Sequence, residues 1–467
     1  MSAPTKRSSL GDVLRTSLPA AIDLSSQTIA WLIEAIFIGM ISAAAFAGVG
    51  ISLQIILLTF TVILTFVVGA SVIILNYLGA NDEWGANHVF AQALIIGTIL
   101  SFLISIFWYF GGSQLMLLIG EDEPAAREYG IQYLKTVSWC GPLIILNFIA
   151  LGIMRMAGDT LTTMKINLFA NGLHITLSPI FIFGWGFIPR MEATGAAIAV
   201  SIAHSLAFFI TLYHLRSRNN ILFLSLREFT KPNMETVKKL FRLGMPTTVE
   251  QLVWAVGQLV LSFYAGQISI LVLATHTAYV RIQSVLTMAF QGFGLASMSL
   301  VGKSLGAQDD QKAIDAGATA QNVALGFSIA FAVLLVVFKR PLLEIFTTEA
   351  EVIALGISSM LIVAIIQIPK GINAVLSGNL RGSGDLKWLM YISLFSVVLF
   401  ELIGGYYSSF VFHFSLAGLW ALQGADETLR MVLNYWRFKR GKWKIRDLLG
   451  DKIPFRNPLK DKGQDSE

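Results

Sequence analysis

The 467-residue sequence carries little charge and almost no cysteine. Charged residues make up 13% of the chain and hydrophobic residues 55%, whereas a soluble globular domain usually carries about 25% charged residues. A chain of this composition has too few polar groups to cover the surface of a water-soluble fold. The single cysteine, Cys140, excludes an intramolecular disulfide, a thiolate metal cluster and a CxxC redox pair.

Enzyme motifs are also missing. The chain contains no HExxH, no GxSxG and no Walker loop, and no loop is long enough for a nucleotide-binding domain. A membrane-embedded enzyme or a receptor would show polar clusters at one membrane face or a large ligand-binding domain, and the sequence has neither. We therefore expect no enzymatic activity and no cofactor.

What the chain has instead is a series of long apolar segments. A helix of about 20 apolar residues spans the hydrocarbon core, and backbone groups in lipid must be satisfied internally. Long runs without polar alternation favour helices over a barrel. The sequence therefore predicts an all-α integral membrane protein with twelve transmembrane helices, at roughly 16–40, 46–77, 89–111, 130–155, 163–186, 194–215, 242–264, 272–302, 315–338, 352–380, 388–411 and 415–436.

Basic residues gather in alternate loops. Lys and Arg are concentrated at 216–242 and 437–462, and the loops on the opposite side carry few. By the positive-inside rule, both termini are expected in the cytoplasm, and the modest length favours a prokaryotic inner (plasma) membrane. Topology and anionic lipid explain the net charge of +5 better than a nucleic-acid partner does.

The two halves of the chain resemble each other. At an offset of 227 residues, Pro19 aligns with Pro246 and Asp23 with Glu250, and LGANDEWGA at 78–86 aligns with LGAQDDQKA at 305–313. At an offset of 226, RMAGD at 155–159 aligns with RGSGD at 381–385. This repeat predicts two pseudo-symmetric six-helix bundles in parallel orientation, an arrangement common in transporters.

The domain organisation follows from the repeat. We expect an N-lobe at 1–217 with helices 1–6, a cytoplasmic inter-lobe loop at 218–240, a C-lobe at 241–438 with helices 7–12, and a basic cytoplasmic tail at 439–467.

Several of these segments resemble the MATE (multidrug and toxic compound extrusion) family of the MOP superfamily. They are WLIEAIFIGMISAAAFAGVG at 31–50, MPTTVEQ at 245–251, LVGKSLGA at 300–307, and the RMAGD and LRGSGD turns. Their order and spacing cover nearly the whole chain. The resemblance implies two six-helix lobes around a V-shaped central cavity, and export of organic, often cationic, compounds against entry of Na+ or H+.

Ionisable groups inside a bilayer are costly, so each is a functional candidate. Glu250 follows Pro246 in the seventh span, and Trp254, Leu261 and Tyr264 lie on the same helical face. A carboxylate beside aromatic rings suits both cation coordination and binding of an organic cation. The resemblance supports this role, because Glu250 matches an acidic residue of the NorM-type branch.

The first span carries two further carboxylates. Asp23 and Glu34 are eleven residues apart and share a helical face with Gln27 between them. Asp23 is either solvated near the cytoplasmic interface or functional. Glu34 occupies the position of the Asp in the family's VD motif, and we expect it to take part in cation coupling, with Na+ binding at Glu34 or Glu250 as one option.

The chain departs from the family at four positions, in the fifth, sixth and tenth predicted spans. His174 and Ser178 precede Pro179 where one branch has Asn and Asp, and Val200 stands where Thr is expected. Lys370 follows Pro369 where NorM-type members have Asp. These changes remove carboxylates from both of the family's Na+ sites, so they favour H+ over Na+.

The roles of Lys370 and His174 stay open at this level. Lys370 either forms an ion pair with Glu250, snorkels toward the interface, or has a structural partner. A lone His such as His174 is more often a hydrogen-bonded core residue than a member of a proton relay. The spacing of Asp426 and Arg430 predicts an ion pair on one helix face, and Arg281 and Gln283 are expected near the interface.

We therefore predict a monomeric secondary active transporter that exports small organic cations, in antiport with H+ or Na+. The few charges expected in its cavity are mainly acidic, which suits cationic cargo. The alternative is a lipid-linked oligosaccharide flippase of the same superfamily, which usually adds helices or basic cavity residues.

Overall fold

The computed structural model describes residues 10–119, 124–218, 220–224 and 232–444, and the expected tail lies outside these ranges from residue 445 onward. The first half contains α1 (Leu10–Gly39), α2 (Ala43–Gly79), α3 (Glu83–Ile106), η1 (Phe107–Gly111), α4 (Gly112–Ile119), α5 (Pro124–Met156), α6 (Thr160–Phe183) and α7 (Glu192–Leu215). The second half contains α9 (Met234–Ile268), α10 (Ile270–Gly306), α11 (Asp310–Val337), α12 (Lys339–Glu344), α13 (Ala350–Gly382), α14 (Leu386–Ser396), η2 (Val397–Gly404), η3 (Tyr407–Val411) and α15 (Leu416–Lys439), where η marks π-helical segments.

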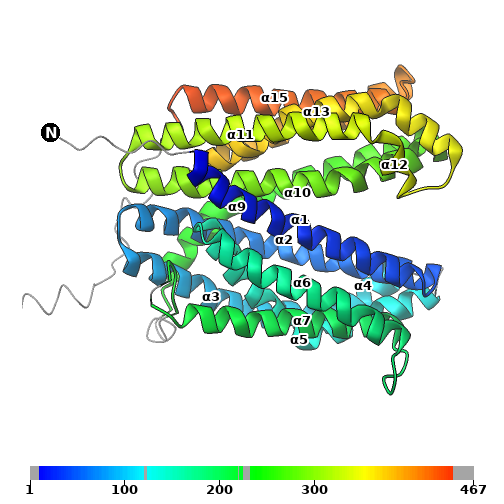
Figure 1. The fold of residues 1–467 in the computed structure, drawn as a ribbon, viewed down its shortest axis with the longest axis horizontal. Helices are drawn as coiled ribbons and strands as arrows, with labels where there is room; N and C mark the ends of the chain where they lie inside the picture. The colour runs from blue at the N-terminus through cyan, green and yellow to red at the C-terminus, as the bar shows by residue number, and fades with distance from the viewer. Residues whose placement is uncertain (1–9, 120–123, 219, 225–231, 445–467) are drawn as a thin grey trace, which may run out of the picture. The chain divides into compact units, whose positions relative to one another are not determined.

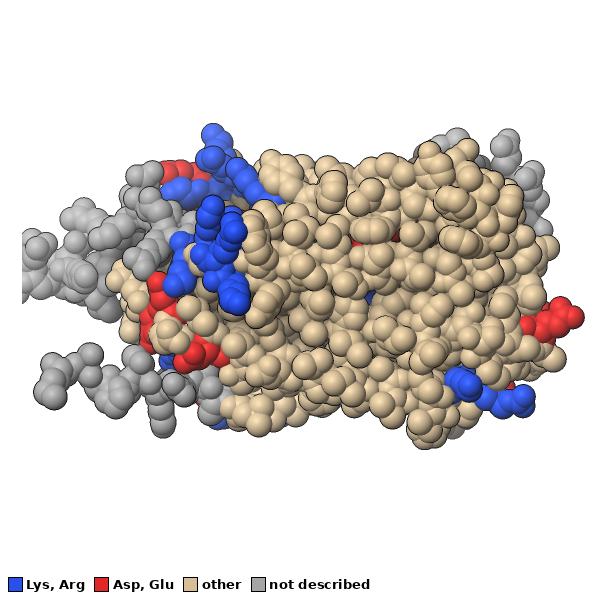
Figure 2. Space-filling model, turned by 90° about the horizontal axis from the view of Figure 1, so that it is seen from above, with Lys and Arg blue, Asp and Glu red and all other residues tan. Residues whose placement is uncertain are grey.

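The all-helical membrane fold is confirmed, and each of the twelve predicted spans coincides with helical structure. Among the described residues, ten helical segments are long and apolar enough to cross a membrane. The other two are α9 and α15, which carry charged side chains along their length. The face drawn in Figure 2 has a broad uncharged area, with Lys, Arg, Asp and Glu near its two ends. Such a surface suits contact with lipid.

Equivalent helix starts in the two halves are capped in the same way. The Ser42 hydroxyl accepts a hydrogen bond from the Ala45 N–H at 3.0 Å at the start of α2. The Ser269 hydroxyl does the same with the Val272 N–H at 3.1 Å at the start of α10. A serine N-cap satisfies one of the unpaired N–H groups of the first turn, so the repeat fixes where both helices begin.

The turns between helices repeat as well. Asn81 and Gln308, 227 residues apart, both adopt left-handed backbone angles, with φ of 56° and 59°. Gly158 and Gly384 close the later pair of turns with φ of 98° and 82°, a conformation that glycine adopts without steric cost. The internal repeat read from the sequence is therefore present in the backbone.

The chain divides into two compact units. The described part of the N-terminal unit lies within residues 26–244, and that of the C-terminal unit comprises residues 10–25 and 245–444. The boundaries fall inside α1 and α9, so each of these helices contributes residues to both units. α9 begins at Met234, eight residues before the seventh span expected from the sequence.

The C-terminal unit is built around the crossing of α10 and α13 (Figure 1). Gly378 of α13 lies so close to Gly294 of α10 that a Cβ at Gly378 would be 2.0 Å from the Gly294 carbonyl oxygen. Close packing of small residues is a common way for membrane helices to associate. Pro246 lies inside α9 and Pro369 inside α13, and each is followed within four residues by a charged side chain.

Candidate functional site

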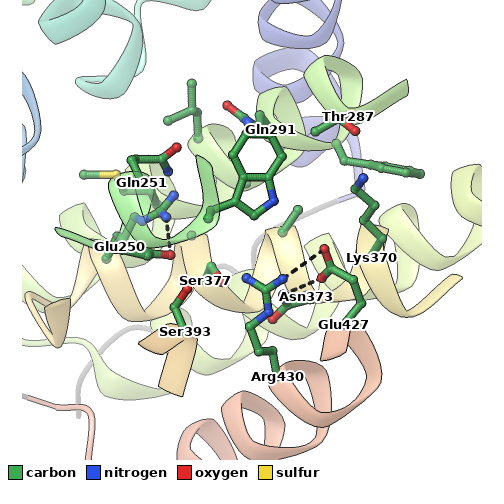
Figure 3. A pocket seen from close by; sticks show the side chains of 18 residues that line it. Glu250, Gln251, Thr287, Gln291, Lys370, Asn373, Ser377, Ser393, Glu427 and Arg430 are labelled. Atoms are coloured by element: carbon green, nitrogen blue, oxygen red, sulfur yellow. Dashed lines mark hydrogen bonds and ion pairs between the residues drawn. The ribbon is translucent and has the colours of Figure 1, made fainter. Parts of the chain in front are cut away.

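A cavity in the C-terminal unit is lined by α9, α10, α13, α14 and α15 and has a volume of about 130 Å³. We call it the C-terminal cavity (Figure 3). The residues of its wall that carry charge or an aromatic ring near that charge include Glu250, Trp254, Lys370, Arg381, Glu427 and Arg430. All of these come from α9, α13 and α15, so three helices supply the chemistry of the cavity.

Glu250 forms an ion pair within this wall. Its Oε1 accepts a hydrogen bond from Arg381 Nη2 at 2.8 Å, and Arg381 comes from the last turn of α13. Trp254, one helical turn after Glu250, lines the same cavity as expected. The carboxylate and the aromatic ring predicted to act together on the seventh span therefore do lie together.

Lys370 has a different partner from the one considered. Its Nζ donates to Gln283 Oε1 at 2.9 Å, so pairing of Lys370 with Glu250 is wrong for this structure. Gln283 lies well inside α10 and is 4% exposed, so its expected interfacial position is wrong too. Lys370 is 8% exposed, and its ammonium group is hydrogen-bonded to a neutral amide instead of a carboxylate.

The predicted pair of Asp426 and Arg430 is present and belongs to a larger network. Arg430 donates to Asp426 and lies 3.3 Å from Glu427 Oε1. Asn373 of α13 donates to Glu427 Oε2 at 3.0 Å, and Asn434 donates to Asn373 at 2.9 Å. Figure 3 shows Asn373, Glu427 and Arg430 together on one side of the cavity, away from Glu250. The last helix therefore contributes directly to the cavity.

The wall of the C-terminal cavity is less acidic than the sequence analysis predicted. Its two carboxylates, Glu250 and Glu427, are outnumbered by three cations, Lys370, Arg381 and Arg430. Both wall carboxylates have an arginine partner. The prediction that the charges of the cavity are mainly acidic is therefore wrong for this wall.

Glu401 and Asp426 are fully buried in the C-terminal unit and do not line the cavity. Glu401 belongs to the π-helical segment η2, and π-helical insertions occur often at functional sites. Among the described residues, no donor is within hydrogen-bond distance of either carboxylate oxygen of Glu401. Such a group is expensive to keep charged in a low-dielectric interior.

A second group of polar residues lies in the N-terminal unit around Glu34. Glu34 is 2% exposed, and its Oε1 accepts a hydrogen bond from the Tyr133 hydroxyl at 3.2 Å. His174 Nε2 lies 3.6 Å from the same oxygen, and the ring of His204 is centred 6.5 Å from that of His174. The structure therefore brings Glu34 and His174 together.

The remaining predicted site residues take other positions. Asp23 is fully buried in the C-terminal unit, so the solvated interpretation of Asp23 is wrong. Gln27 is half-buried on α1, and the Ser178 hydroxyl donates to the His174 carbonyl within α6. The Tyr264 hydroxyl donates to the Leu402 carbonyl of η2 at 3.0 Å, and Tyr264 is not part of the cavity wall.

Sequence reasoning gave too little weight to several residues of these sites. Arg381 was read only as part of a turn, and Arg430 mainly as the partner of Asp426. Glu401 and Glu427, in the last two predicted spans, were weighed only as weaker candidates for substrate binding, and His204 was given no role. The available signal was charge at span depth, which applies to Glu401, Glu427 and Arg430 as well as to Glu250.

A comparison with protein-family models finds the same family in both halves of the chain. The MatE family model matches residues 19–180 and again residues 246–407. The second match begins and ends 227 residues after the first, the offset at which the two halves align. Together the two matches cover more than half of the chain.

Curated relatives match over most of their length. The probable multidrug resistance protein NorM of Thermotoga maritima is 27% identical, with 94% of each chain covered. The protein of the same description from Pasteurella multocida is 30% identical, with 82% of each chain covered. An uncharacterized transporter, YisQ, of Bacillus subtilis is 26% identical, with 91% of this chain and 93% of YisQ covered.

Solved structures share the fold. A MOP superfamily transporter from Pyrococcus furiosus, described as having a binding pocket of reverse polarity, superposes with a TM-score of 0.85 at 23% identity, covering 94% of this chain and 96% of the other. A MATE transporter described as outward-facing gives a TM-score of 0.84 at 23% identity, with the same coverage.

Proposed function

Because the chain belongs to the MatE family of multi-pass membrane transporters, we propose that it exports small organic compounds in antiport with H+ or Na+. Relatives over nearly the full length are described as probable multidrug resistance proteins, which supports a broad range of substrates. The proposed location is the plasma membrane of a prokaryote, with both termini in the cytoplasm and a monomer as the working unit. The two lobes expected at 1–217 and 241–438 remain part of this proposal.

The observation that carries the proposal is the C-terminal cavity. Its wall combines aromatic and apolar side chains, such as Trp254, Phe290 and Leu295, with the charged side chains of α9, α13 and α15. Ligand sites typically join apolar lining with a few placed polar groups. An organic ion with an aromatic body matches this lining better than a hydrated inorganic ion does.

A net negative environment supports cationic cargo. The charged residues of the wall together with Glu401 and Asp426 number four carboxylates and three cations, a net charge of −1 when all are ionised. One positive charge, carried by a substrate or a proton, neutralises the set. The preference for cationic compounds thus rests on the buried carboxylates and not on the wall alone.

Coupling in the N-terminal unit is assigned to Glu34. A hard cation such as Na+ prefers several oxygen ligands, whereas Glu34 is surrounded by one phenol and one imidazole, those of Tyr133 and His174. A phenol and an imidazole can both exchange hydrogen bonds with a carboxyl group that gains and loses a proton. This set of neighbours favours H+ over Na+.

The test is efflux of ethidium, a fluorescent aromatic cation, from proteoliposomes under an imposed pH gradient or an imposed Na+ gradient. We expect the pH gradient to drive efflux in the wild type, and Glu34→Gln to reduce that driven efflux at least tenfold. Glu349→Gln, at an exposed glutamate, is the matched control and should behave as the wild type.

Two other results would change the assignment. Efflux driven only by the Na+ gradient would show that Na+ is the coupling ion, and the proposal that the protein exports organic compounds would still hold. No efflux of ethidium or of a panel of other organic cations would remove the proposed function and favour lipid-linked cargo, which the same vesicles can test with a fluorescent lipid-linked oligosaccharide.

A further inference from the structure

The C-terminal unit contains a group of five buried charged side chains that no role above accounts for in full. They are Glu401 of η2, Lys370 of α13, and Asp426, Glu427 and Arg430 of α15, each less than a tenth exposed. We call them the buried charge cluster. Three of its members, Lys370, Glu427 and Arg430, line the C-terminal cavity. A charged molecule in the cavity would therefore interact electrostatically with the cluster.

The cluster does not balance its own charge. Three carboxylates and two cations give a net charge of −1 when all five groups are ionised. An uncompensated charge is unfavourable in a low-dielectric interior. Uptake of one proton, or arrival of one external cation, makes the cluster neutral.

Within the cluster, Glu401 is the carboxylate least able to stay ionised. Glu427 accepts a hydrogen bond from Asn373 and pairs with Arg430, and Asp426 pairs with Arg430 as well. Neither oxygen of Glu401 has a hydrogen-bond donor or a cation in contact among the described residues. The proton that neutralises the cluster therefore belongs on Glu401.

Glu401 packs tightly against α9 and has no exposed surface. A Cβ added to Gly257 of α9 would lie 1.8 Å from Glu401 Oε2, so the carboxyl group is pressed against the α9 backbone. Tyr264, farther along α9, donates its hydroxyl to the carbonyl of Leu402, the next residue of η2. Both contacts hold η2 and α9 together at this point.

The charges facing Glu401 come from two helices. α15 contributes Asp426, Glu427 and Arg430, and α13 contributes Lys370. α14 carries one charged side chain, Lys387, in its first turn, nine residues before η2 begins. The protonation of Glu401 is thus set by the buried charge cluster and by whatever enters the cavity beside it.

We propose that Glu401 is a proton-binding carboxylate whose proton is displaced when an organic cation occupies the C-terminal cavity. The cation then supplies the positive charge that the proton supplied, and the carboxyl O–H bond breaks to leave a carboxylate on Glu401 and release the proton to the solvent. Departure of the cation leaves Glu401 ready to take up a proton again. Substrate and proton exclude each other, which is the requirement for antiport, and the substrate need not touch Glu401.

This inference rests on the proposed function in one respect, that the cavity accepts an organic cation. It differs from the assignment of Glu34, which lies in the other unit. Binding and proton release at Glu401 are equilibrium properties of the purified protein, so they can be measured without vesicles or a gradient.

The experiment measures ethidium binding to the purified full-length protein in detergent, with proton release followed by a pH indicator in weakly buffered solution. In the pH range where Glu401 is protonated, the wild type should release close to one proton per ethidium bound. Its apparent Kd should fall about tenfold for each pH unit gained, because a linked single proton requires that slope. Glu401→Gln should release no proton, and its Kd should change less than twofold over the same range.

Three controls make the outcome decisive. Glu349→Gln should release protons as the wild type does. Glu235→Gln, at an exposed glutamate of α9, should also keep the release. Should Glu401→Gln fail to fold, Glu401→Asp keeps a carboxyl group with a shorter arm and should shift the pH of half-maximal release; an unchanged midpoint would overturn the inference.

Proton release that persists in a folded Glu401→Gln protein, or wild-type binding without release, would also overturn it while leaving export intact. Failure of the proposed function has a different signature, the absence of ethidium efflux from wild-type vesicles.

Discussion

The two units share a repeat, yet Glu34 and Glu401, the two acids to which we assign proton exchange, lie at different positions of that repeat. At the 227-residue offset that relates the two family matches, Glu34 corresponds to Leu261, and His174 corresponds to Glu401. At these two positions, the N-terminal unit has an acid on α1 and a histidine on α6. The C-terminal unit has an aliphatic side chain on α9 and an acid on η2, and the acid that it carries elsewhere on α9, Glu250, pairs with Arg381.

The surroundings of the two acids differ as well. Glu34 has the Tyr133 hydroxyl and the His174 imidazole beside it, whereas Glu401 has no hydrogen-bond donor in reach among the described residues. The positions equivalent to Asp426, Glu427 and Arg430 are Ala199, Val200 and Ala203. One scaffold therefore carries a hydrogen-bonded single acid in one copy and a buried charge cluster in the other.

The largest difference between the units should appear when the cluster loses a cation. Arg430→Met leaves Asp426 and Glu427 buried without their partner, and breaking a buried pair costs roughly 3–5 kcal/mol. We expect a large drop in the thermal unfolding temperature in detergent. Arg340→Met, at an exposed and long pair with Glu344, should change it little. Equal shifts for the two variants would show that the cluster is not a stabilising network.

A smaller effect is expected from crowding Glu401. Gly257→Ala places a methyl group where the Glu401 carboxylate now lies, and overpacking of this kind costs roughly 1–3 kcal/mol. Gly326→Ala on α11 is the matched control, because nothing lies within 4 Å of a Cβ there. We expect Gly257→Ala to lower the unfolding temperature and Gly326→Ala to leave it unchanged or raised. Unchanged stability and unchanged proton release in Gly257→Ala would contradict the close packing of Glu401.

The smallest effect should come from the N-terminal unit. Tyr133→Phe removes the one phenol that donates to Glu34, and an ordinary hydrogen bond contributes about 1 kcal/mol. Tyr213→Phe, at an 81% exposed side chain, should have no effect on the unfolding temperature. A loss as large as that of Arg430→Met would mean that Glu34 depends on this bond as strongly as the cluster depends on its arginine.

The fold could be predicted almost completely from the sequence, because its causes are local. Apolar runs set the spans. The turn motif LGANDEWGA contains the cap Asp82, the preceding turn contains the cap Ser42, and the copies of these caps are Asp309 and Ser269. The charged α9 and α15 were predicted as spans from their apolar runs at 242–264 and 415–436, and the repeat agrees with the six helices that they complete in the second half. By length and apolar composition alone, ten helical segments qualify as membrane spans, and α9 and α15 are not among them.

The sites could be predicted only in part, because their partners are distant in the chain. Glu250 and Trp254 were found together since four residues separate them, whereas Arg381 is 131 residues from Glu250. The departure at Lys370 was visible in the sequence, but its partner Gln283 was not. The isolation of Glu401 depends on which helix packs against it, and no local pattern reports that.

The most direct test of the account is infrared difference spectroscopy of the purified protein with and without ethidium. A protonated carboxyl group has a C=O stretching band distinct from that of a carboxylate. We predict that this band weakens when ethidium binds to the wild type and to Glu34→Gln, and that the change is absent in Glu401→Gln. A band change that disappears in Glu34→Gln and persists in Glu401→Gln would contradict the account and place the displaced proton in the N-terminal unit.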